Sequence, residues 1–260
     1  MSDNLQQLSD GYRRLVNNLD AQREAIATAA DWFVQSILKG RLVHLFGAGH
    51  SRILVEEMWP RYGSFPGFHP IVELSLTFHN QVVGANGQRQ AMFLEQSSGL
   101  AARIMRNFQL SQDDRALVIS SSGCNIVTIE MAEQFKMQKI PVVALVSLAH
   151  CEASTSHHTD GVKLTDFADL VLDTGAPRGD AMIEIEGLPT PVSPASTIGG
   201  CMIINAIKCE VAQRLVDAGQ PPPVLTASNV IAAEESARLF EAAYDEHARR
   251  ISKLFANLGA

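Results

Sequence analysis

The stretch from residue 115 to residue 125, with the sequence RALVISSSGCN, constrains the fold of this chain more than any other. Four apolar residues, two of them β-branched, run directly into three serines and a glycine. Apolar side chains then recur at every fourth position, at Val127, Met131 and Phe135, as they do along one face of an α-helix. This pattern predicts a buried strand that ends in a tight loop and leads at once into a helix.

The predicted loop suits an anion the size of one phosphate. Backbone N–H groups at the start of a helix lack partners within the helix, and the helix dipole favours negative charge there. The three serines add hydroxyl donors, and Gly123 allows the backbone to approach a ligand closely. The loop lacks the lysine of a GxxxxGK[ST] motif, which argues against a nucleoside triphosphate. The residues alone fit a simpler role equally well, in which Ser122 only caps the helix.

The composition is typical of a globular protein and excludes several classes of function. With 260 residues and 46% hydrophobic content, the chain can bury one compact core with helical appendages. Its formal net charge of -7 gives no electrostatic footprint for nucleic acid. The polar first residues do not resemble a signal peptide, and no apolar run approaches the roughly 18 residues of a membrane span. We therefore expect neither a nucleic-acid nor a membrane partner.

The cysteines and histidines give no metal-binding pattern. None of the four cysteines forms a CxxC pair, and their spacing fits no zinc module. Adjacent side chains rarely point at one ion, so His157 and His158 are expected to lie in a solvated loop. We expect no metal and no cofactor, and a reducing, cytoplasmic compartment is the simplest interpretation of the cysteines.

Residues 1–39 contain no proline and carry a narrow apolar stripe. Its positions alternate spacings of three and four, as in a helix that resembles a coiled-coil seam; they are Leu5, Leu8, Tyr12, Leu15, Leu19, Ile26, Ala29 and Phe33. Gln22 interrupts the stripe, Gly11 is expected to weaken the helix or split it, and Gly40 is a natural C-cap. A stripe of this length predicts packing on a partner subunit, hence a homo-oligomer of at least two chains.

A second glycine-rich turn, residues 47–51 (GAGHS), follows a predicted strand at 41–46 and precedes a predicted helix at 52–59. The GxG spacing resembles the start of a dinucleotide-binding fingerprint, but Arg52 occupies the third glycine position. The turn is better explained as a second strand-to-helix loop on the same sheet edge as the serine loop.

The rest of the chain alternates short apolar strands with helices. Predicted strands cover 68–72, 140–147 and 169–172, and predicted helices cover 100–108, 198–216 and 230–254. Residues 149–158 are expected to form a polar loop, and 175–194 to be irregular except for a strand at 181–185. Such alternation predicts a parallel, doubly wound sheet whose ligands bind beyond the carboxyl ends of the strands. We expect one structural domain, made of an N-terminal helical segment (1–39), a central part (40–225) and a C-terminal helix (226–260).

Several short motifs resemble the SIS (sugar isomerase) domain over roughly residues 40–225. They are GAGHS at 47–51, SSSG at 120–123, SPAST at 193–197, ALVSLAH at 144–150, ADLVLD at 168–173, GDA at 179–181 and PPV at 222–224. The nearest resemblance is to a phosphoheptose-isomerase-like subgroup. It implies a three-layer α/β/α sandwich with a five-stranded parallel sheet, of the flavodoxin or Rossmann type. It also implies a phosphosugar ligand, and dimers or tetramers with sites near subunit boundaries.

The resemblance assigns binding roles to residues of the matching motifs. The implied phosphate and substrate residues are Gly47, Gly49, His50, Ser51, Ser120, Ser121, Ser122, Gly123, Asn125, Ser196 and Thr197. Two positions depart from the subgroup. Cys124 stands where arginine is common, which bears on phosphate affinity or sugar preference. Asn80 follows His79 where relatives have His-Glu, which argues against a catalytic role for that pair.

Aldose–ketose isomerisation needs a base for the proton next to the carbonyl and an acid for ring opening. Glu57 lies about one and a half helical turns beyond Ser51. In the related etherase and heptose-isomerase branches, a glutamate in this stretch acts as acid or base, so Glu57 is the first catalytic candidate. The alternative is a solvated helix carboxylate such as Glu56.

A second catalytic candidate, Glu210, lies in the predicted helix 198–216 together with Lys208. Residues two apart do not share a helix face, so at most one of these two charges points inward, and Glu210 is ranked first. Glu95 and His79 are kept in reserve.

Two functional hypotheses follow. The first is a sugar-phosphate isomerase, or an etherase, deaminase or deglycase acting on an amino sugar, all of which begin with proton removal beside a carbonyl or imine. The second is a non-catalytic sensor that binds a phosphosugar and regulates a partner. A nicotinamide dehydrogenase is weaker, because the third glycine is missing and no ribose-binding acid is evident.

Overall fold

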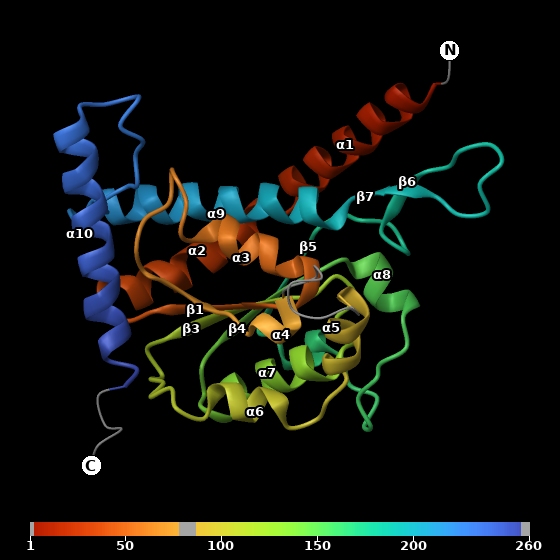
Figure 1. Ribbon diagram of the computed structural model, residues 1–260, viewed down its shortest axis with the longest axis horizontal. Helices are drawn as coiled ribbons and strands as arrows, with labels where there is room; N and C mark the ends of the chain where they lie inside the picture. The colour runs from red at the N-terminus through yellow and green to blue at the C-terminus, as the bar shows by residue number, and fades with distance from the viewer. Residues whose placement is uncertain (1–2, 78–86, 256–260) are drawn as a thin grey trace.

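A computed structural model describes residues 3–77 and 87–255 of the chain (Figure 1). Its centre is a five-stranded parallel sheet in the order β2-β1-β3-β4-β5. The strands are β1 (Val43–Gly47), β2 (Phe68–Ile71), β3 (Arg115–Ile119), β4 (Val142–Val146) and β5 (Leu170–Asp173). The predicted fold class is therefore confirmed. Among the described residues, no helix is both long and apolar enough to cross a membrane.

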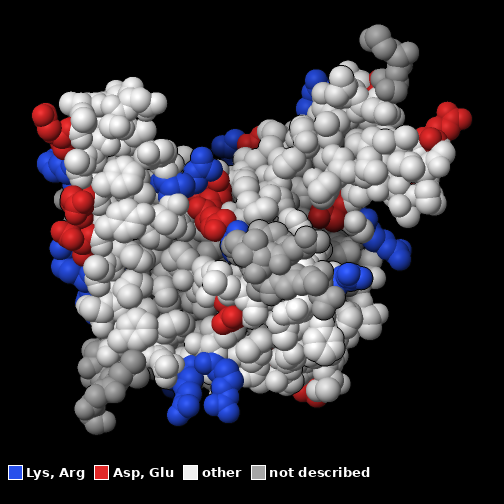
Figure 2. Space-filling view, in the orientation of Figure 1, with Lys and Arg blue, Asp and Glu red and all other residues white. Residues whose placement is uncertain are grey.

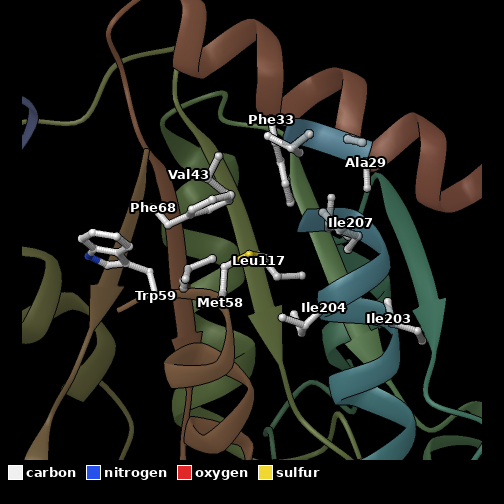
Figure 3. Packing of buried hydrophobic residues seen from close by; sticks show 14 of the residues in the cluster. Ala29, Phe33, Val43, Met58, Trp59, Phe68, Leu117, Ile203, Ile204 and Ile207 are labelled. Carbon is white, nitrogen blue, oxygen red and sulfur yellow. The ribbon is translucent and has the colours of Figure 1, made fainter. Parts of the chain in front are cut away.

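Each face of the sheet is covered by its own layer of helices. In β3, Leu117 and Ile119 face one hydrophobic cluster, while Ala116 and Val118 face the other, as the two-residue period of a strand requires. The first cluster packs against α2 (Arg23–Leu38), α3 (Arg52–Met58) and α9 (Ser196–Asp217). The second packs against α6 (Leu100–Met105) and α7 (Ile126–Met137). Figure 3 shows the first cluster, with Phe33 and Ile207 packed over the strands.

The remaining elements lie at the ends of this sandwich. Next to the carboxyl edge of the sheet are the 3₁₀ turn η1 (Gly49–Ser51) and the short helices α4 (Leu74–Thr77), α5 (Gln88–Leu94) and α8 (Leu148–Ala153). The 3₁₀ turn η2 (Leu164–Phe167) precedes β5. Helix α1 (Asn4–Ala21) projects from the body beside the hairpin of β6 (Ala181–Ile183) and β7 (Val192–Pro194), and α10 (Ala233–Ser252) stands at the opposite end (Figure 1).

The N-terminal helical segment divides at Gln22, not at Gly11 as predicted. The side chain of Gln22 bonds both backbone groups of Asp173, donating to its O at 2.8 Å and accepting from its N at 2.7 Å. Gly11 lies inside α1, where an added Cβ would meet Met182 Sδ at 3.1 Å. The polar residue in the stripe thus joins the helices to β5, and the glycine permits close packing.

Three other boundaries differ from the prediction. The expected polar loop at 149–158 begins as α8, because the Ser147 hydroxyl accepts the N–H of His150 at 3.2 Å and caps the helix. The segment 175–194 contains the strand expected near 181–185, as β6, and pairs it with a second short strand, β7, that was not predicted. Helix α10 begins at Ala233, three residues after its predicted start at 230.

Acidic and basic side chains are intermixed on the face of the molecule shown in Figure 2. Along α10 they alternate, as in the ion pairs that Glu235 forms with Arg238 and Glu246 with Arg250. As far as the described residues of this face show, no broad basic patch is present.

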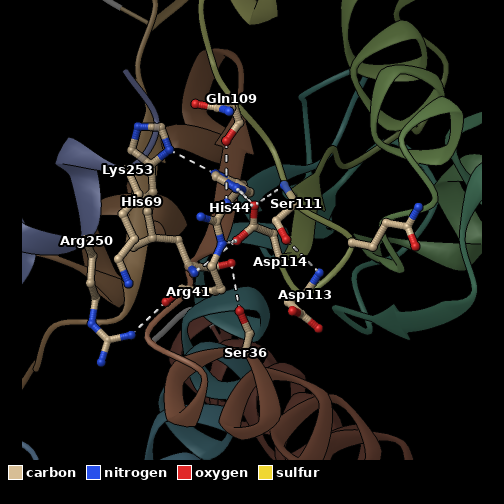
Figure 4. Close-up of polar contacts among 12 residues, drawn as sticks. Ser36, Arg41, His44, His69, Gln109, Ser111, Asp113, Asp114, Arg250 and Lys253 are labelled. Atoms are coloured by element: carbon tan, nitrogen blue, oxygen red, sulfur yellow. Dashed lines mark hydrogen bonds and ion pairs between the residues drawn. The ribbon is translucent and has the colours of Figure 1, made fainter. Parts of the chain in front are cut away.

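A buried polar cluster lies at the opposite, amino-terminal end of the sheet (Figure 4). His44 and His69 face each other with their Nδ1 atoms 2.9 Å apart, and His44 Nε2 lies 3.3 Å from Asp114 Oδ2. Arg41 donates two hydrogen bonds to the Asp114 carboxylate, at 2.9 and 2.7 Å. Burial lowers the pKa of His69 to about 3, with a further contribution from His44. Protonation of His69 is therefore unfavourable in the folded cluster at any pH well above 3.

The lowered pKa of His69 should be visible in how the free energy of unfolding depends on pH. The folded-state pKa of His69 lies below its ordinary value of 6.5, so its stabilising effect is present above pH 6.5 and is lost as the pH falls toward 3. A difference of this size corresponds to roughly 5 kcal/mol over that window. Urea unfolding at several pH values should show a flatter profile between pH 3 and 6.5 for His69→Gln than for the native protein. The exposed His157→Gln is the control, and an equally steep profile in both variants would contradict the assignment.

Candidate functional site

A cavity of about 430 Å³ opens at the carboxyl ends of β1, β3, β4 and β5. Most of the residues predicted from the motifs lie on its wall, namely Gly49, His50, Ser51, Ser120, Ser121, Ser122, Asn125, Ser196 and Thr197. Gly47 and Gly123 belong to the same two loops but do not line the cavity. The two strand-to-helix turns and the start of α9 therefore come together around one hollow.

The serine loop is folded on itself. The hydroxyl of Ser120 accepts the N–H of Gly123 at 3.1 Å, and that of Ser122 accepts the N–H of Cys124 at 3.3 Å. Gly123 has a φ of 65°, in the left-handed region that favours glycine, and an added Cβ would meet Cys151 Sγ at 3.2 Å. Each of the two hydroxyls uses its oxygen inside the loop, which leaves its O–H available as a donor.

Asn125 occupies the N-cap position of α7 but makes no side-chain bond to its own helix. Its Nδ2 donates to the carboxylate of Glu95, and its Oδ1 accepts from Gln96 Nε2 at 2.9 Å. The backbone N–H of Val127 also donates to the carbonyl of Glu95, at 3.0 Å. The residues after α5 are thus fastened to the helix start that follows the serine loop.

The cavity wall includes Glu95, whose carboxyl has a strongly shifted pKa. Its side chain is buried, with only 7% of the residue exposed. Burial raises its pKa to about 7, and the hydrogen bond from Asn125 opposes that rise. A carboxyl that titrates near neutral pH can both accept and donate a proton. Sequence reasoning kept Glu95 only in reserve, because its burial depends on contacts with α7 that no local pattern shows.

The cavity wall also carries His150 from α8 and Asp180 from the loop before β6. His150 Nδ1 accepts the N–H of Gly179 at 2.9 Å, so in the neutral ring the proton sits on Nε2. The Asp180 carboxylate binds the N–H and hydroxyl of Ser196, at 2.7 and 2.8 Å, and thereby caps α9. Sequence reasoning assigned His150 no role and placed it in the polar loop 149–158, although the residue ends the ALVSLAH motif, where such sheets bind ligands.

The two carboxylates ranked first as catalysts do not line this cavity. Glu57 pairs with Arg61 and accepts a bond from Asn205 Nδ2 at 2.8 Å. Burial works to raise its pKa, but the hydrogen bonds from Asn205 and Arg61 outweigh that effect and the pKa lies below its ordinary value. Catalysis by Glu57 stays a prediction.

On α9, the inward charge is Lys208, not Glu210. Lys208 Nζ donates to the carbonyl of Glu57 at 2.7 Å, where α3 is ending. Glu210 is exposed and pairs with Arg214, so its catalytic role stays an untested prediction. His79 and Asn80 lie outside the described residues.

Replacing Glu95 should change stability in a pH-dependent way. The folded-state pKa of Glu95 lies above its ordinary value of 4.5, so its contribution to stability is complete below pH 4.5 and is lost as the pH rises through 7. Compared with the native protein, Glu95→Gln should therefore gain roughly 3 kcal/mol of unfolding free energy between pH 5 and pH 8 or above. Urea unfolding at both pH values measures this, with the exposed Glu184→Gln as control. A constant difference between Glu95→Gln and the native protein would sink the assignment.

The comparisons with known proteins agree with this geometry. Residues 8–147, more than half of the chain, match the SIS domain family. A UPF0309 protein of Listeria innocua is 32% identical over 246 residues, covering 95% of this chain and 96% of that protein. A UPF0309 protein of Geobacillus sp. strain WCH70 is 33% identical over 222 residues, covering 85% and 87%.

Among solved structures, a phosphoheptose isomerase from Francisella tularensis has the same fold. The TM-score is 0.50 at 16% sequence identity, and the match covers 79% of this chain and 94% of that one. The family match begins inside α1, so it includes the N-terminal helices that the motif resemblance left out. The chain therefore belongs to the SIS domain family, within its UPF0309 group.

Proposed function

We propose that this protein binds a sugar phosphate in the serine-loop cavity and transfers a proton beside the sugar's carbonyl group. The observation that carries the proposal is the position of Glu95, whose carboxyl has a pKa near 7 and faces the same cavity as the serine loop. General acid–base catalysis is most efficient when the pKa of the catalytic group lies near the working pH.

The serine loop supplies the phosphate site in this proposal. Hydroxyl groups of Ser51, Ser120 and Ser122 line the cavity together with the start of α7, whose dipole favours an anion. Among the described residues that line the cavity there is no lysine or arginine. A phosphate monoester would therefore be held by hydroxyl and backbone donors, without a balancing cation from these residues. Cys124 is buried beneath the loop and does not line the cavity.

The chemistry follows from the cavity residues Glu95 and His150. The Glu95 carboxylate takes the proton from the hydroxyl-bearing carbon next to the carbonyl, and the C–H electron pair forms the C=C bond of an enediolate while the carbonyl π pair moves to its oxygen. The neutral His150 ring can donate its Nε2–H as a hydrogen bond to that oxygen. Transfer of the proton of the neighbouring hydroxyl to that oxygen, and return of the proton from Glu95 to the former carbonyl carbon, complete an aldose–ketose isomerisation, which we propose as the reaction type. Etherases, deaminases and deglycases acting on amino-sugar phosphates share the first step.

Ligand stabilisation tests the binding part of the proposal. A hexose, heptose or amino-sugar phosphate at about 100 times its dissociation constant should add roughly 2.7 kcal/mol to the unfolding free energy, whereas the unphosphorylated sugar should not. Ser122→Ala should weaken binding by about 1.5–3 kcal/mol, because one charge-assisted hydrogen bond is removed. Thermal shift measures both effects, with Ser9→Ala on the exposed face of α1 as control. Equal stabilisation by sugar and sugar phosphate would refute a phosphate site.

Hydrogen exchange tests the chemical part. With a bound sugar phosphate in deuterated water, NMR should show exchange of the carbon-bound proton next to the carbonyl. Glu95→Gln keeps the size of the side chain but removes the proton acceptor, so exchange should fall at least about 100-fold while binding persists. Glu57→Gln is the matched variant outside the cavity. Exchange that survives in Glu95→Gln and vanishes in Glu57→Gln would move the base to Glu57, and no exchange in the native protein would favour a phosphosugar sensor.

We also propose that the protein is a homo-oligomer in a reducing compartment such as the cytoplasm. Helix α1 and the β6–β7 hairpin expose apolar side chains, among them Leu5 and Leu188, at 78% and 51%. Figure 2 shows the surface notched between α1 and α10, where a second copy would find room. All four cysteines are free, including the buried Cys124 and Cys151. Light scattering at micromolar concentration should give a mass of at least two chains, and removal of α1 should lower it.

A further inference from the structure

Three polar side chains at the junction of α5 and α7 form a hydrogen-bonded chain. Gln96 Nε2 donates to Asn125 Oδ1 at 2.9 Å, and Asn125 Nδ2 donates to the Glu95 carboxylate. Every donor in this chain points toward Glu95, which is the arrangement that suits its charged form. At the far end, Gln96 Oε1 is buried and has no hydrogen-bond partner among the described residues.

The far end of the chain does not fix its direction, because either end of the Gln96 amide would lack a partner among the described residues at that position. A buried acceptor without a donor is unfavourable, and native proteins rarely retain one without a reason. If both amides turned by 180°, Asn125 Nδ2 would donate to Gln96 Oε1, and Gln96 Nε2 would take the buried position in which Oε1 now has no described partner. Asn125 Oδ1 would then face Glu95, and a charged carboxylate would repel it. A protonated carboxyl would instead donate its O–H to that oxygen.

We propose that Gln96 and Asn125 form a reversible amide pair whose direction follows the proton on Glu95. In the charged state both amides donate toward Glu95. When Glu95 gains a proton, from the sugar carbon or from solvent, its new O–H donates to Asn125 Oδ1 and both amides reverse. The only covalent change is the O–H bond of the carboxyl group. Glu95 thus keeps a hydrogen-bond partner in both protonation states, as a group that first accepts and then returns a proton requires.

Gln96 is a positioning residue in this scheme, because it acts on Glu95 only through Asn125. The inference rests on the proposed function in taking Glu95 as the acid–base group. Among the described residues, the other histidine and carboxylate side chains facing the cavity are His50 from η1, His150 from α8 and Asp180 from the loop before β6. Glu130 of α7 accepts bonds from the turn after Gln96, at Ser98 Oγ (2.6 Å) and Gly99 N (2.8 Å), and so fixes that turn.

Neutron diffraction tests the reversal directly, because it distinguishes the N–D₂ group of an amide from its oxygen. Crystals of the native protein without ligand, at pH 5 and pH 9, should show opposite orientations of Asn125 and Gln96. The same orientation at both pH values would overturn the proposal. Because no substrate is involved, this outcome is separate from a failure of proton exchange on a sugar phosphate.

A pair of variants tests the same idea in solution. In Gln96→Glu the new carboxylate can only accept, so Asn125 is held with Oδ1 toward Glu95 and the protonated form of Glu95 is favoured. NMR titration of the Glu95 carboxyl carbon should then show a midpoint at least about one pH unit higher than in Ser97→Asp, which adds a charge next to the chain without joining it. A midpoint no higher than that of Ser97→Asp would overturn the proposal. If Gln96→Glu does not fold, diffraction from the native protein decides.

Discussion

The register of the parallel ladder is the constraint on which the site depends. Gly47 pairs with Ile119, and Ile119 pairs with Leu145, so three strands end at one level. The ladder continues one step into the loops, because Ser120 N donates to the Leu145 carbonyl at 3.1 Å. A slip of one residue would turn the apolar side chains of a strand to the wrong face and move its loop away from the others. The hydrophobic layers on the two faces therefore fix the position of the glycine turn relative to the serine loop.

Charge in the cavity is balanced by protons and dipoles. The described lining residues include the Glu95 and Asp180 carboxyls but no lysine or arginine. The Asp180 carboxylate accepts two hydrogen bonds from Ser196 at the start of α9. For Glu95, the hydrogen bond from the Asn125 amide only partly offsets the rise in pKa that burial causes. A phosphate entering the same cavity would disfavour the charged form of Glu95 further. Ligand binding and protonation of Glu95 would then favour each other, and by linkage the affinity for phosphate would rise as the pH falls through neutrality.

The sequence predicted what local pattern determines and missed what long-range contacts determine. Strands β3 and β4 were predictable because short apolar runs end in serine, and the family motifs singled out the serine loop at 120–123. The break at Gln22 depends on a bond to Asp173, 151 residues away, which periodicity cannot show. The burial of Glu95 likewise depends on contacts with α7, 30 residues further along the chain, which periodicity cannot show. The spacing of Lys208 and Glu210 showed that they lie on different faces of the helix, but it did not show which of the two faces inward.

Two glutamates near the ends of short helices, Glu57 and Glu95, have opposite electrostatic environments. Asn205 from α9 and Arg61 from the turn after α3 stabilise the charged form of Glu57, and its pKa falls. Glu95 is buried with a single amide donor, and its pKa rises to about 7. The pKa of Glu95 near 7 allows both protonation states close to neutral pH, whereas the lowered pKa of Glu57 favours a carboxylate that joins α3 to α9. Environments that push the pKa values of two carboxyls apart commonly mark a division of roles, and this contrast supports the proposal that Glu95, rather than Glu57, transfers the proton.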